Sequence, residues 1–331
     1  MAEIGVLGTT TWGTTLAVLT AQDGHTVRLW ARTDAEAAEL SSAGENWRLP
    51  GVSFPASLKV TASKEEAFAH ADLVIVVVPS RTLRENARAI AGSVSDSTIL
   101  VSATKGLEIE SGKRMSQVLE EEIPAATASS ICALSGPNLA SEIVNGKPST
   151  TVIACSNIDA AAVAQSIVNS GRFRVYTNSD IVGVEFGGAL KNIIALGAGV
   201  IDGLDYGDNA KAAFMTRGLA EIARLAVASG ADPMTLSGLA GMGDLIATCA
   251  SKLSRNHYVG EQLVKGRRLD EILEGMANVA EGVDTTAAAV GLARRLGVDM
   301  PIALATHEVL FNNVPIVQAV AGLLGRVPIP E

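Results

Sequence analysis

The hydrophobic and polar positions in the first half of the chain alternate between two patterns. Short apolar runs predict strands, and the stretches between them have the spacing of helices. The run Leu73–Val78 is apolar at every position, which is typical of a central strand covered on both faces. The predicted strands are Ile4–Leu7, Val27–Trp30, Leu73–Val78, Ile99–Ser102, Ile131–Ser135, Thr150–Ala154 and Phe173–Tyr176. This alternation predicts βαβ units and a doubly wound, largely parallel sheet.

Helix-end residues mark two helices in this half. Gly24 follows the predicted helix Thr14–Gln22 as a C′ residue, and Asp34 is predicted to be the N-cap of the helix Ala35–Ser42. After Thr177 the strand pattern fades and helical stretches continue to the end. Examples are Val182–Val200, Ala210–Ser229, His257–Lys265, Thr285–Leu296 and Ile302–Leu310, and residues 326–331 are predicted to form an extended tail. The chain is therefore predicted to form an α/β domain over residues 1–177 and an all-α domain over residues 178–331.

The first predicted strand leads into a glycine turn and a helix start. Gly8 and Gly13 occupy the first and third glycine positions of the dinucleotide fingerprint G-x-G-x-x-G, and Thr10 replaces the middle glycine. The location of this turn, between the first predicted strand and the helix after it, predicts a Rossmann-like dinucleotide site. The alternative is an ordinary strand–turn–helix. Since the middle glycine lets the pyrophosphate approach the backbone, the Cβ of Thr10 is expected to crowd the pyrophosphate or shift it outward.

Arg32 follows the second predicted strand, where dehydrogenases that use NAD carry an acidic residue for the ribose 2′-hydroxyl. A guanidinium in this place can bind the 2′-phosphate of NADP through a two-point contact. The alternative is a solvated surface arginine.

Composition and charge narrow the function classes. The chain has 331 residues, of which 48% are hydrophobic and 18% charged, as expected for a globular protein of two domains. Its net charge of −9 argues against non-specific binding to nucleic acid or to anionic membranes. An anionic ligand must therefore meet local positive charge.

Three cysteines, Cys132, Cys155 and Cys249, lack the spacing of a disulfide framework or a metal cluster, so we predict buried thiols in a reducing compartment and no metal. The amino terminus leads directly into a strand, and no apolar run has the length of a membrane span. A cytoplasmic protein without a membrane or nucleic-acid partner is predicted.

Polar residues follow two of the predicted strands. Lys105 comes after Ile99–Ser102, and Gly136 and Asn138 come after Ile131–Ser135. Ligands of open α/β sheets bind at the carboxyl ends of strands, so these residues are candidates for a ligand site.

The helical half adds two polar groups. Lys191 and Asn192 interrupt an apolar helix, and a lysine there either reaches water or lines a site where it can exchange a proton near neutral pH. Asp244 and Thr248 are spaced to share one helical face, although Asp244 is alternatively a simple N-cap.

Ser254, Arg255 and Asn256 precede a helical stretch. Free N–H groups at a helix start and a guanidinium suit a phosphate, and plain N-capping by Ser254 is the alternative. All these candidate residues are expected to converge on one cleft.

Five motifs, taken in order, closely resemble the NAD(P)-dependent glycerol-3-phosphate dehydrogenases of bacterial type. They are Ala103–Glu108, Ser135–Asn138, Gly188–Asn192, Gly241–Leu245 and Ser254–Asn256. The resemblance implies reversible hydride transfer between NAD(H) or NADP(H) and carbon 2 of dihydroxyacetone phosphate. The product, sn-glycerol 3-phosphate, would feed glycerophospholipid synthesis, and the protein would be a homodimer.

The resemblance also implies residue roles. Lys191 would exchange the proton at the C2 oxygen, with Lys105 and Asp244 around the reacting group. The implied substrate-binding residues are Lys105, Gly136, Asn138, Lys191, Asn192, Asp244, Thr248, Ser254, Arg255 and Asn256, with Arg255 and Asn256 on the phosphate. The implied dinucleotide-binding residues are Gly8, Thr10, Thr11, Trp12, Gly13, Arg32, Lys105, Ala140, Arg255, Val279 and Glu281. His257 stands where the family often has an arginine or an aromatic residue, a departure with little expected consequence.

Two other functions are open. A two-domain reductase of an unphosphorylated hydroxy acid would not need Arg255 and Asn256 as a phosphate pair. A nucleotide-binding sensor, suggested by Thr10, would not need Lys105, Lys191 and Asp244.

Overall fold

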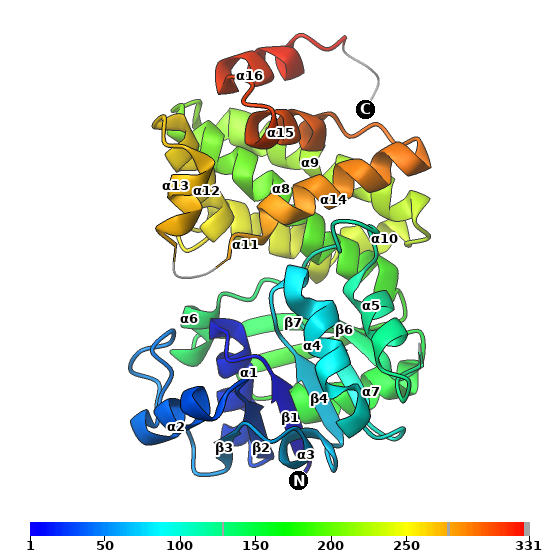
Figure 1. Ribbon diagram of the computed structural model, residues 1–331. Helices are drawn as coiled ribbons and strands as arrows, with labels where there is room; N and C mark the ends of the chain where they lie inside the picture. The colour runs from blue at the N-terminus through cyan, green and yellow to red at the C-terminus, as the bar shows by residue number, and fades with distance from the viewer. Residues whose placement is uncertain (128, 277–278, 328–331) are drawn as a thin grey trace. The chain divides into compact units, whose positions relative to one another are not determined.

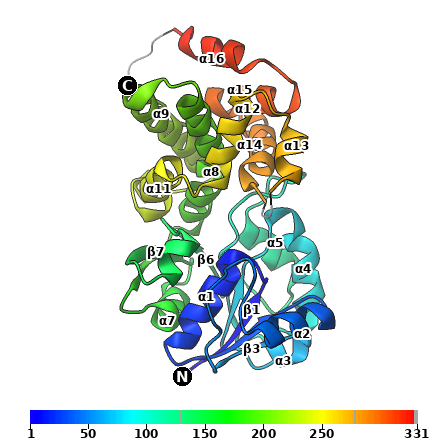
Figure 2. The ribbon, with the colours of Figure 1, turned by 90° about the vertical axis from the view of Figure 1, so that its left-hand side faces the viewer.

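The computed structural model describes residues 1–127, 129–276 and 279–327, and the chain divides into two compact units (Figures 1 and 2). Unit 1 comprises Met1–Lys105 and Arg114–Glu185, and unit 2 comprises Gly106–Lys113 and Phe186–Glu331. This division differs from the predicted boundary after residue 177 in two places. Unit 1 extends to Glu185, and Gly106–Lys113 belongs to unit 2, where Arg295 donates a hydrogen bond to the Ser111 carbonyl (2.8 Å).

The described part of unit 1 contains an eight-stranded sheet with the order β3-β2-β1-β4-β5-β6-β7-β8. Neighbouring strands of this sheet are parallel except β6 and β7, which are antiparallel. The strands are β1 (Glu3–Leu7), β2 (Thr26–Trp30), β3 (Leu58–Thr61), β4 (Leu73–Val76), β5 (Ile99–Ser102), β6 (Ile131–Ser135), β7 (Ser149–Ala154) and β8 (Phe173–Asn178). The order from β3 to β6 is that of a Rossmann fold, with the strand order reversing between β1 and β4. The predicted Rossmann-like fold is confirmed.

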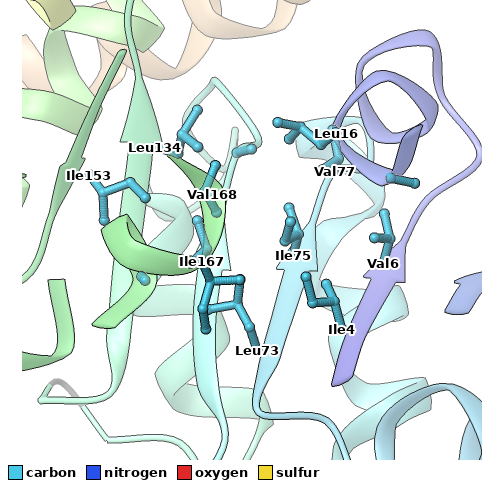
Figure 3. Close-up of a cluster of buried hydrophobic side chains, with 14 of the residues drawn as sticks. Ile4, Val6, Leu16, Leu73, Ile75, Val77, Leu134, Ile153, Ile167 and Val168 are labelled. Carbon is cyan, nitrogen blue, oxygen red and sulfur yellow. The ribbon is translucent and has the colours of Figure 1, made fainter. Parts of the chain in front are cut away.

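Helices cover both faces of this sheet. They are α1 (Thr11–Gln22), α2 (Asp34–Ala43), α3 (Lys64–Phe68), α4 (Leu83–Ile90), α5 (Met115–Glu122), α6 (Ala140–Val144) and α7 (Ile158–Val168), with short 3-10 turns at Ser80–Thr82 and Ala91–Ser93. Successive residues of β4 enter different apolar clusters: Ile75 packs in the cluster that contains Leu16 of α1, and Val76 in the one that contains Leu83 of α4. Figure 3 shows the first cluster, which joins Ile167 and Val168 of α7 to apolar residues of the sheet such as Leu73 and Leu134. The sheet is therefore doubly wound, as predicted.

Unit 2 is mainly helical in its described residues, and its segment Gly106–Lys113 contains no helix. Its helices are α8 (Ile181–Gly203), which begins in unit 1, α9 (Gly207–Ala228), α10 (Pro233–Leu236), α11 (Asp244–Ala250), α12 (Arg255–Val264), α13 (Leu269–Glu274), α14 (Glu281–Leu296), α15 (Pro301–Phe311) and α16 (Ile316–Leu324), with a π-helical turn, η3, at Leu239–Gly243. Among the described residues, α8 alone is long and apolar enough to cross a membrane, but 83% of its most apolar window is buried. It is therefore the core helix of unit 2.

Three details differ from the sequence predictions. Strand β3 was not predicted, and the helix N-cap is Thr33 instead of Asp34, because Thr33 has an extended backbone and its hydroxyl accepts a hydrogen bond from Glu36 N (3.2 Å). Helices α10, α13 and α16 lie in the region predicted to be helical, but they are not among the example stretches named from the sequence. Of the predicted extended tail, residues 328–331 lie outside the described residues.

Candidate active site

The glycine turn joins β1 to α1, and two of its positions require glycine. Gly8 has φ +125°, and a Cβ there would lie 2.2 Å from the Val77 carbonyl oxygen. A Cβ at Gly13 would lie 2.1 Å from the Gly8 carbonyl oxygen. The turn thus brings bare backbone to the N-terminus of a twelve-residue helix, where N–H groups and the helix dipole favour a phosphate. These residues fit the pyrophosphate of a dinucleotide.

Thr10 occupies the middle glycine position without backbone strain. Its φ of −69° and ψ of 164° are ordinary for a residue with a side chain. The hydroxyl accepts a hydrogen bond from Gly13 N (3.0 Å) and donates one to the Val77 carbonyl (3.0 Å). Thr10 is therefore the N-cap of α1, with its hydroxyl bound inside the fold.

We expect Thr10→Gly to leave dinucleotide affinity unchanged or weaker, because the wild-type turn already accommodates the side chain. Loss of the hydroxyl removes the cap of α1, which costs from a few tenths to about 1 kcal/mol of unfolding free energy. Calorimetric titration with NADH and thermal unfolding measure the two effects, and Thr10→Ser, which keeps the hydroxyl, is the control. Several-fold tighter NADH binding by the glycine variant would show that Thr10 crowds the site.

Two polar residues that the sequence analysis missed hold the glycine turn. Asn46 is fully buried in the loop after α2, and its Nδ2 donates to the Thr9 carbonyl (2.9 Å) and to Thr14 Oγ1 (2.7 Å). The Glu36 carboxylate accepts from Thr9 Oγ1 (2.6 Å) and from Arg32 N (3.2 Å). Glu36 thus fixes the backbone of Arg32, whose side chain is exposed.

Three other predicted dinucleotide residues lie at helix starts of unit 1. Thr11 and Trp12 begin α1, and Ala140 begins α6. The half-buried Trp12 ring packs edge-on against Phe173 of β8, with 6.1 Å between the ring centroids. Trp12 therefore also has a packing role.

Unit 1 brings Lys105, Gly136 and Asn138 together after β5 and β6. Lys105 Nζ donates to the Gly136 carbonyl (3.1 Å). The Asn138 side chain donates to the Thr150 carbonyl (3.2 Å) and accepts from Thr151 Oγ1 (3.0 Å), which ties it to β7. Hydrogen bonds therefore fix this loop and the lysine that contacts it.

In unit 2, Lys191 forms a buried ion pair with Asp244. The Lys191 side chain is 9% exposed and that of Asp244 is 1% exposed. Lys191 Nζ contacts Asp244 Oδ1 and donates to Thr248 Oγ1 (2.6 Å). Asp244 is the first residue of α11 and its carboxylate faces Lys191, so the simple N-cap interpretation of Asp244 is wrong. A buried lysine among polar partners can hold and transfer a proton.

Close backbone contact explains how this pair forms. A Cβ at Gly187 of α8 would lie 2.6 Å from the Ala240 carbonyl oxygen, in the π-helical turn η3 that precedes α11. About one helical turn further along each segment, Lys191 meets Asp244. The glycine therefore lets α8 approach closely enough for the two side chains to touch.

Asn192, next to the lysine, connects α8 to the start of α12. Asn256 Nδ2 donates to Asn192 Oδ1 (2.9 Å), and Asn256 Oδ1 accepts from Gly282 N at the start of α14 (3.0 Å). Both asparagines are buried. These hydrogen bonds within the protein hold α8, α12 and α14 together.

Arg255 is the first residue of α12, after Ser254. Ser254 Oγ accepts from His257 N (3.3 Å), so the N-cap interpretation of Ser254 is confirmed. Arg255 reaches solvent, but the protein atoms around it lower the pKa of its guanidinium, and the Glu281 carboxylate opposes this shift. Glu281 starts α14 and Val279 lies just before it. Unit 2 thus places a cation at a helix N-terminus, an arrangement suited to a phosphate.

No metal-binding group is found in the described parts of the chain: no three His, Cys, Asp or Glu side chains there could hold a metal ion.

Comparisons with known proteins match nearly the whole chain. Residues 3–161 match the family model described as NAD-dependent glycerol-3-phosphate dehydrogenase N-terminus, and residues 180–321 match the corresponding C-terminus model. A glycerol-3-phosphate dehydrogenase [NAD(P)+] of Dehalococcoides mccartyi is 52% identical over 95% of this chain and 88% of that relative. One of Prosthecochloris aestuarii is 50% identical over 99% of each chain. The crystal structure of glycerol-3-phosphate dehydrogenase from Coxiella burnetii covers 98% of this chain and 99% of its own, with 33% identity and a TM-score of 0.92.

Proposed function

Since the chain belongs to the family of NAD-dependent glycerol-3-phosphate dehydrogenases, we propose that Lys191 is the group that exchanges a proton with the C2 oxygen of the substrate. The chain is an oxidoreductase that uses NAD or NADP. It catalyses the reversible reduction of dihydroxyacetone phosphate to sn-glycerol 3-phosphate. We infer that this product serves glycerophospholipid synthesis.

The buried Lys191–Asp244 pair is the observation that supports this role most directly. When bound, reduced nicotinamide supplies a hydride to carbon 2. The Lys191 ammonium stabilises the negative charge that develops on the C2 oxygen and donates the proton that completes the alcohol. In the oxidation direction, the neutral amine accepts that proton. Asp244 compensates the buried ammonium and, with Thr248, fixes its position.

Arg255 and the N-terminus of α12 are proposed to bind the substrate phosphate. The guanidinium can make a two-point contact with phosphate, and the helix start adds free N–H groups. Asn256 and Asn192 hold this helix start against α8, which carries Lys191. Binding the phosphate orients carbon 2, and good orientation lowers the barrier of the chemical step. The resemblance that assigns these roles also assigns Lys105 to the reacting group and the dinucleotide.

A steady-state assay separates this function from that of a hydroxy-acid reductase. Dihydroxyacetone phosphate and unphosphorylated 2-keto acids are compared, with NADH and NADPH titrated separately. We expect turnover of dihydroxyacetone phosphate and at most traces with the keto acids. A higher kcat/KM for a keto acid would instead support the hydroxy-acid reductase.

Arg32 is proposed to contact the 2′-phosphate of NADP. Its backbone is held by Glu36 at the end of β2, and its side chain is exposed. Arg32→Ala is expected to raise the KM for NADPH by about 10-fold, the value of one charge-assisted hydrogen bond, and to change the KM for NADH far less. Lys59→Ala, which removes another exposed cation of unit 1, is the control. Equal changes in both KM values would refute this role.

We also propose that the chain forms a homodimer, through α16 and the groove beside it. Helix α16 carries no charged residue, and none of its residues is buried within the described chain. Val317 and Leu324 are 67% and 80% exposed. The adjacent groove has a volume of about 750 Å³ and is lined mainly by apolar side chains of α8, α9, α15 and α16. A second copy of the chain presents the same helix and the same groove. In a two-fold dimer, the apolar surface of each copy is therefore covered by that of the other.

Light scattering after size-exclusion chromatography tests the dimer. We expect the wild type to have twice the mass of one chain, and Leu324→Asp to be monomeric because a charge enters the interface. Val227→Asp, at an exposed position of α9 outside the groove, is the control and should stay dimeric. A monomeric wild type, or a dimeric Leu324→Asp variant, would contradict this interface.

A cytoplasmic location is proposed as well. The three cysteines, Cys132, Cys155 and Cys249, are buried and form no disulfide, which is usual in a reducing compartment.

A further inference from the structure

Helices α8 and α12 are in direct backbone contact. A Cβ at Gly199 of α8 would lie 2.0 Å from the His257 carbonyl oxygen, and a Cβ at Gly260 of α12 would lie 2.0 Å from the Leu196 carbonyl oxygen. We call Gly199 and Gly260 the glycine seam. At either position any side chain forces the helices apart, because real Cβ atoms do not approach backbone atoms this closely.

Polar contacts join the same two helices on both sides of Gly199 in α8, and both contacts are made by residues in the first turn of α12. On one side, Asn192 of α8 accepts the hydrogen bond from Asn256 of α12. On the other, the Asp202 carboxylate of α8 lies 2.7 Å from His257 Nε2 and also accepts from Lys211 Nζ of α9 (2.6 Å). The His257 ring is 5% exposed, so it is enclosed at this contact. His257, which stands where the family often has another residue, therefore forms a buried contact between α12 and α8. The sequence analysis did not foresee this contact.

The two helices also carry the two ends of the proposed substrate site. Lys191 lies on α8 directly before Asn192, and Arg255 lies on α12 directly before Asn256. The proposed proton donor and the proposed phosphate ligand thus lie on two helices whose backbones are in direct contact. Moving an added Cβ from 2.0 Å to the 3.4 Å of ordinary contact requires a shift of about 1.4 Å. A misplacement of about 1 Å can already cost on the order of 100-fold in rate.

We propose that the glycine seam and the Asp202–His257 pair form a positioning device that sets the distance between Lys191 and Arg255. The device thereby selects a substrate whose carbonyl and phosphate are spaced as in dihydroxyacetone phosphate. This inference rests on the proposed roles of Lys191 and Arg255. If the device acts in this way, a change in the distance between Lys191 and Arg255 leaves the function of each residue intact. A general loss of helix packing would impair both residues.

The test uses Gly260→Ala with Gly291→Ala as its matched control. Gly291 is also a helical glycine, but its added Cβ would meet Arg295 Nη1 only at 3.7 Å, an ordinary contact. Three quantities are measured: kcat/KM for dihydroxyacetone phosphate, kcat/KM for unphosphorylated dihydroxyacetone, and the inhibition constant of inorganic phosphate. Thermal unfolding and NADH affinity show whether the variants are folded.

For Gly260→Ala we expect kcat/KM for dihydroxyacetone phosphate to fall by about 100-fold. The value for dihydroxyacetone and the inhibition constant of phosphate should change less than about threefold, because each contacts only one half of the site. Gly291→Ala should match the wild type in all three. Parallel losses for both substrates, or no loss for the phosphorylated one, would overturn the proposal.

His257 gives an independent route that keeps the proposal testable if Gly260→Ala does not fold. His257→Leu removes the contact with Asp202, and His257→Gln keeps an N–H group near the position of Nε2. We expect the leucine variant to lose about 10-fold in kcat/KM for dihydroxyacetone phosphate alone, the value of one hydrogen bond to a charged group, and the glutamine variant to recover most of it. Equal behaviour of the two variants would refute the role of His257.

Failure of this inference is distinguishable from failure of the proposed function. If Arg255→Ala loses activity specifically with the phosphorylated substrate while the seam and His257 variants do not, the roles of the residues stand and the positioning device is wrong. If Arg255→Ala shows no such loss, the phosphate role itself is wrong.

Discussion

Lys191→Ala is expected to lower kcat for dihydroxyacetone phosphate by at least about 10³-fold, since it removes both the proton donor and the charge that stabilises the C2 alkoxide. NADH affinity should change little, because the glycine turn and Arg32 belong to unit 1, whereas Lys191 belongs to unit 2. Steady-state kinetics measures the first effect and fluorescence titration of NADH the second. Near-normal kcat would refute the role of Lys191.

Stability has to be controlled in this experiment. The single substitution leaves the Asp244 carboxylate buried without its cation, which can cost about 3–5 kcal/mol of unfolding free energy. The double variant Lys191→Ala, Asp244→Asn removes that charge and should be folded yet equally inactive. Lys265→Ala, which replaces an exposed lysine at the end of α12, should keep wild-type kcat and stability.

Arg255→Ala is expected to lower kcat/KM for dihydroxyacetone phosphate by about 10²- to 10³-fold, the combined value of a two-point, charge-assisted contact. Activity with dihydroxyacetone should stay within about threefold of the wild type. This substrate has no phosphate, so it does not make the contact that the substitution removes. Kinetics with both substrates measures the difference.

The matched control for this prediction is Arg294→Ala, which removes an exposed arginine near the end of α14. It should behave as the wild type with both substrates. Arg255 would lose its proposed role if its variant lost activity equally with and without the phosphate.

The fold was predictable because its strands are strongly apolar. Strand β4 is buried at every position, and such a run identifies a central strand without further information. Strand β3 is as short as β4, but Lys59 is exposed within it and Val60 is only half-buried, so its pattern is too mixed to stand out. Helix α16 is apolar, but none of its residues is buried in the described chain, and a periodicity search for a buried face does not detect it.

The site was predictable in its chemistry but less so in its contacts. A lysine within an apolar helix needs a partner, and Asp244 supplies one. That partner could not be identified from spacing, because the approach of α8 depends on the tertiary contact at Gly187. Likewise, the fingerprint suggested crowding at Thr10, whereas its backbone angles and N-cap hydrogen bonds are properties of the folded turn.

Residues whose partners are distant in sequence were missed. Asn46 holds the glycine turn from a loop, and His257 reaches Asp202 from another helix. Neither contact has a local sequence signal, since it is created by packing between elements.

The most direct test of the account is the ratio of kcat/KM for dihydroxyacetone phosphate to that for dihydroxyacetone, measured in the wild type, Lys191→Ala and Arg255→Ala. If Lys191 serves the carbonyl and Arg255 the phosphate, the ratio should collapse by about 10²-fold or more in the Arg255 variant. In the Lys191 variant both values should fall together and the ratio should persist. A ratio that collapses equally in both variants, or in neither, would contradict the division of roles between Lys191 and Arg255.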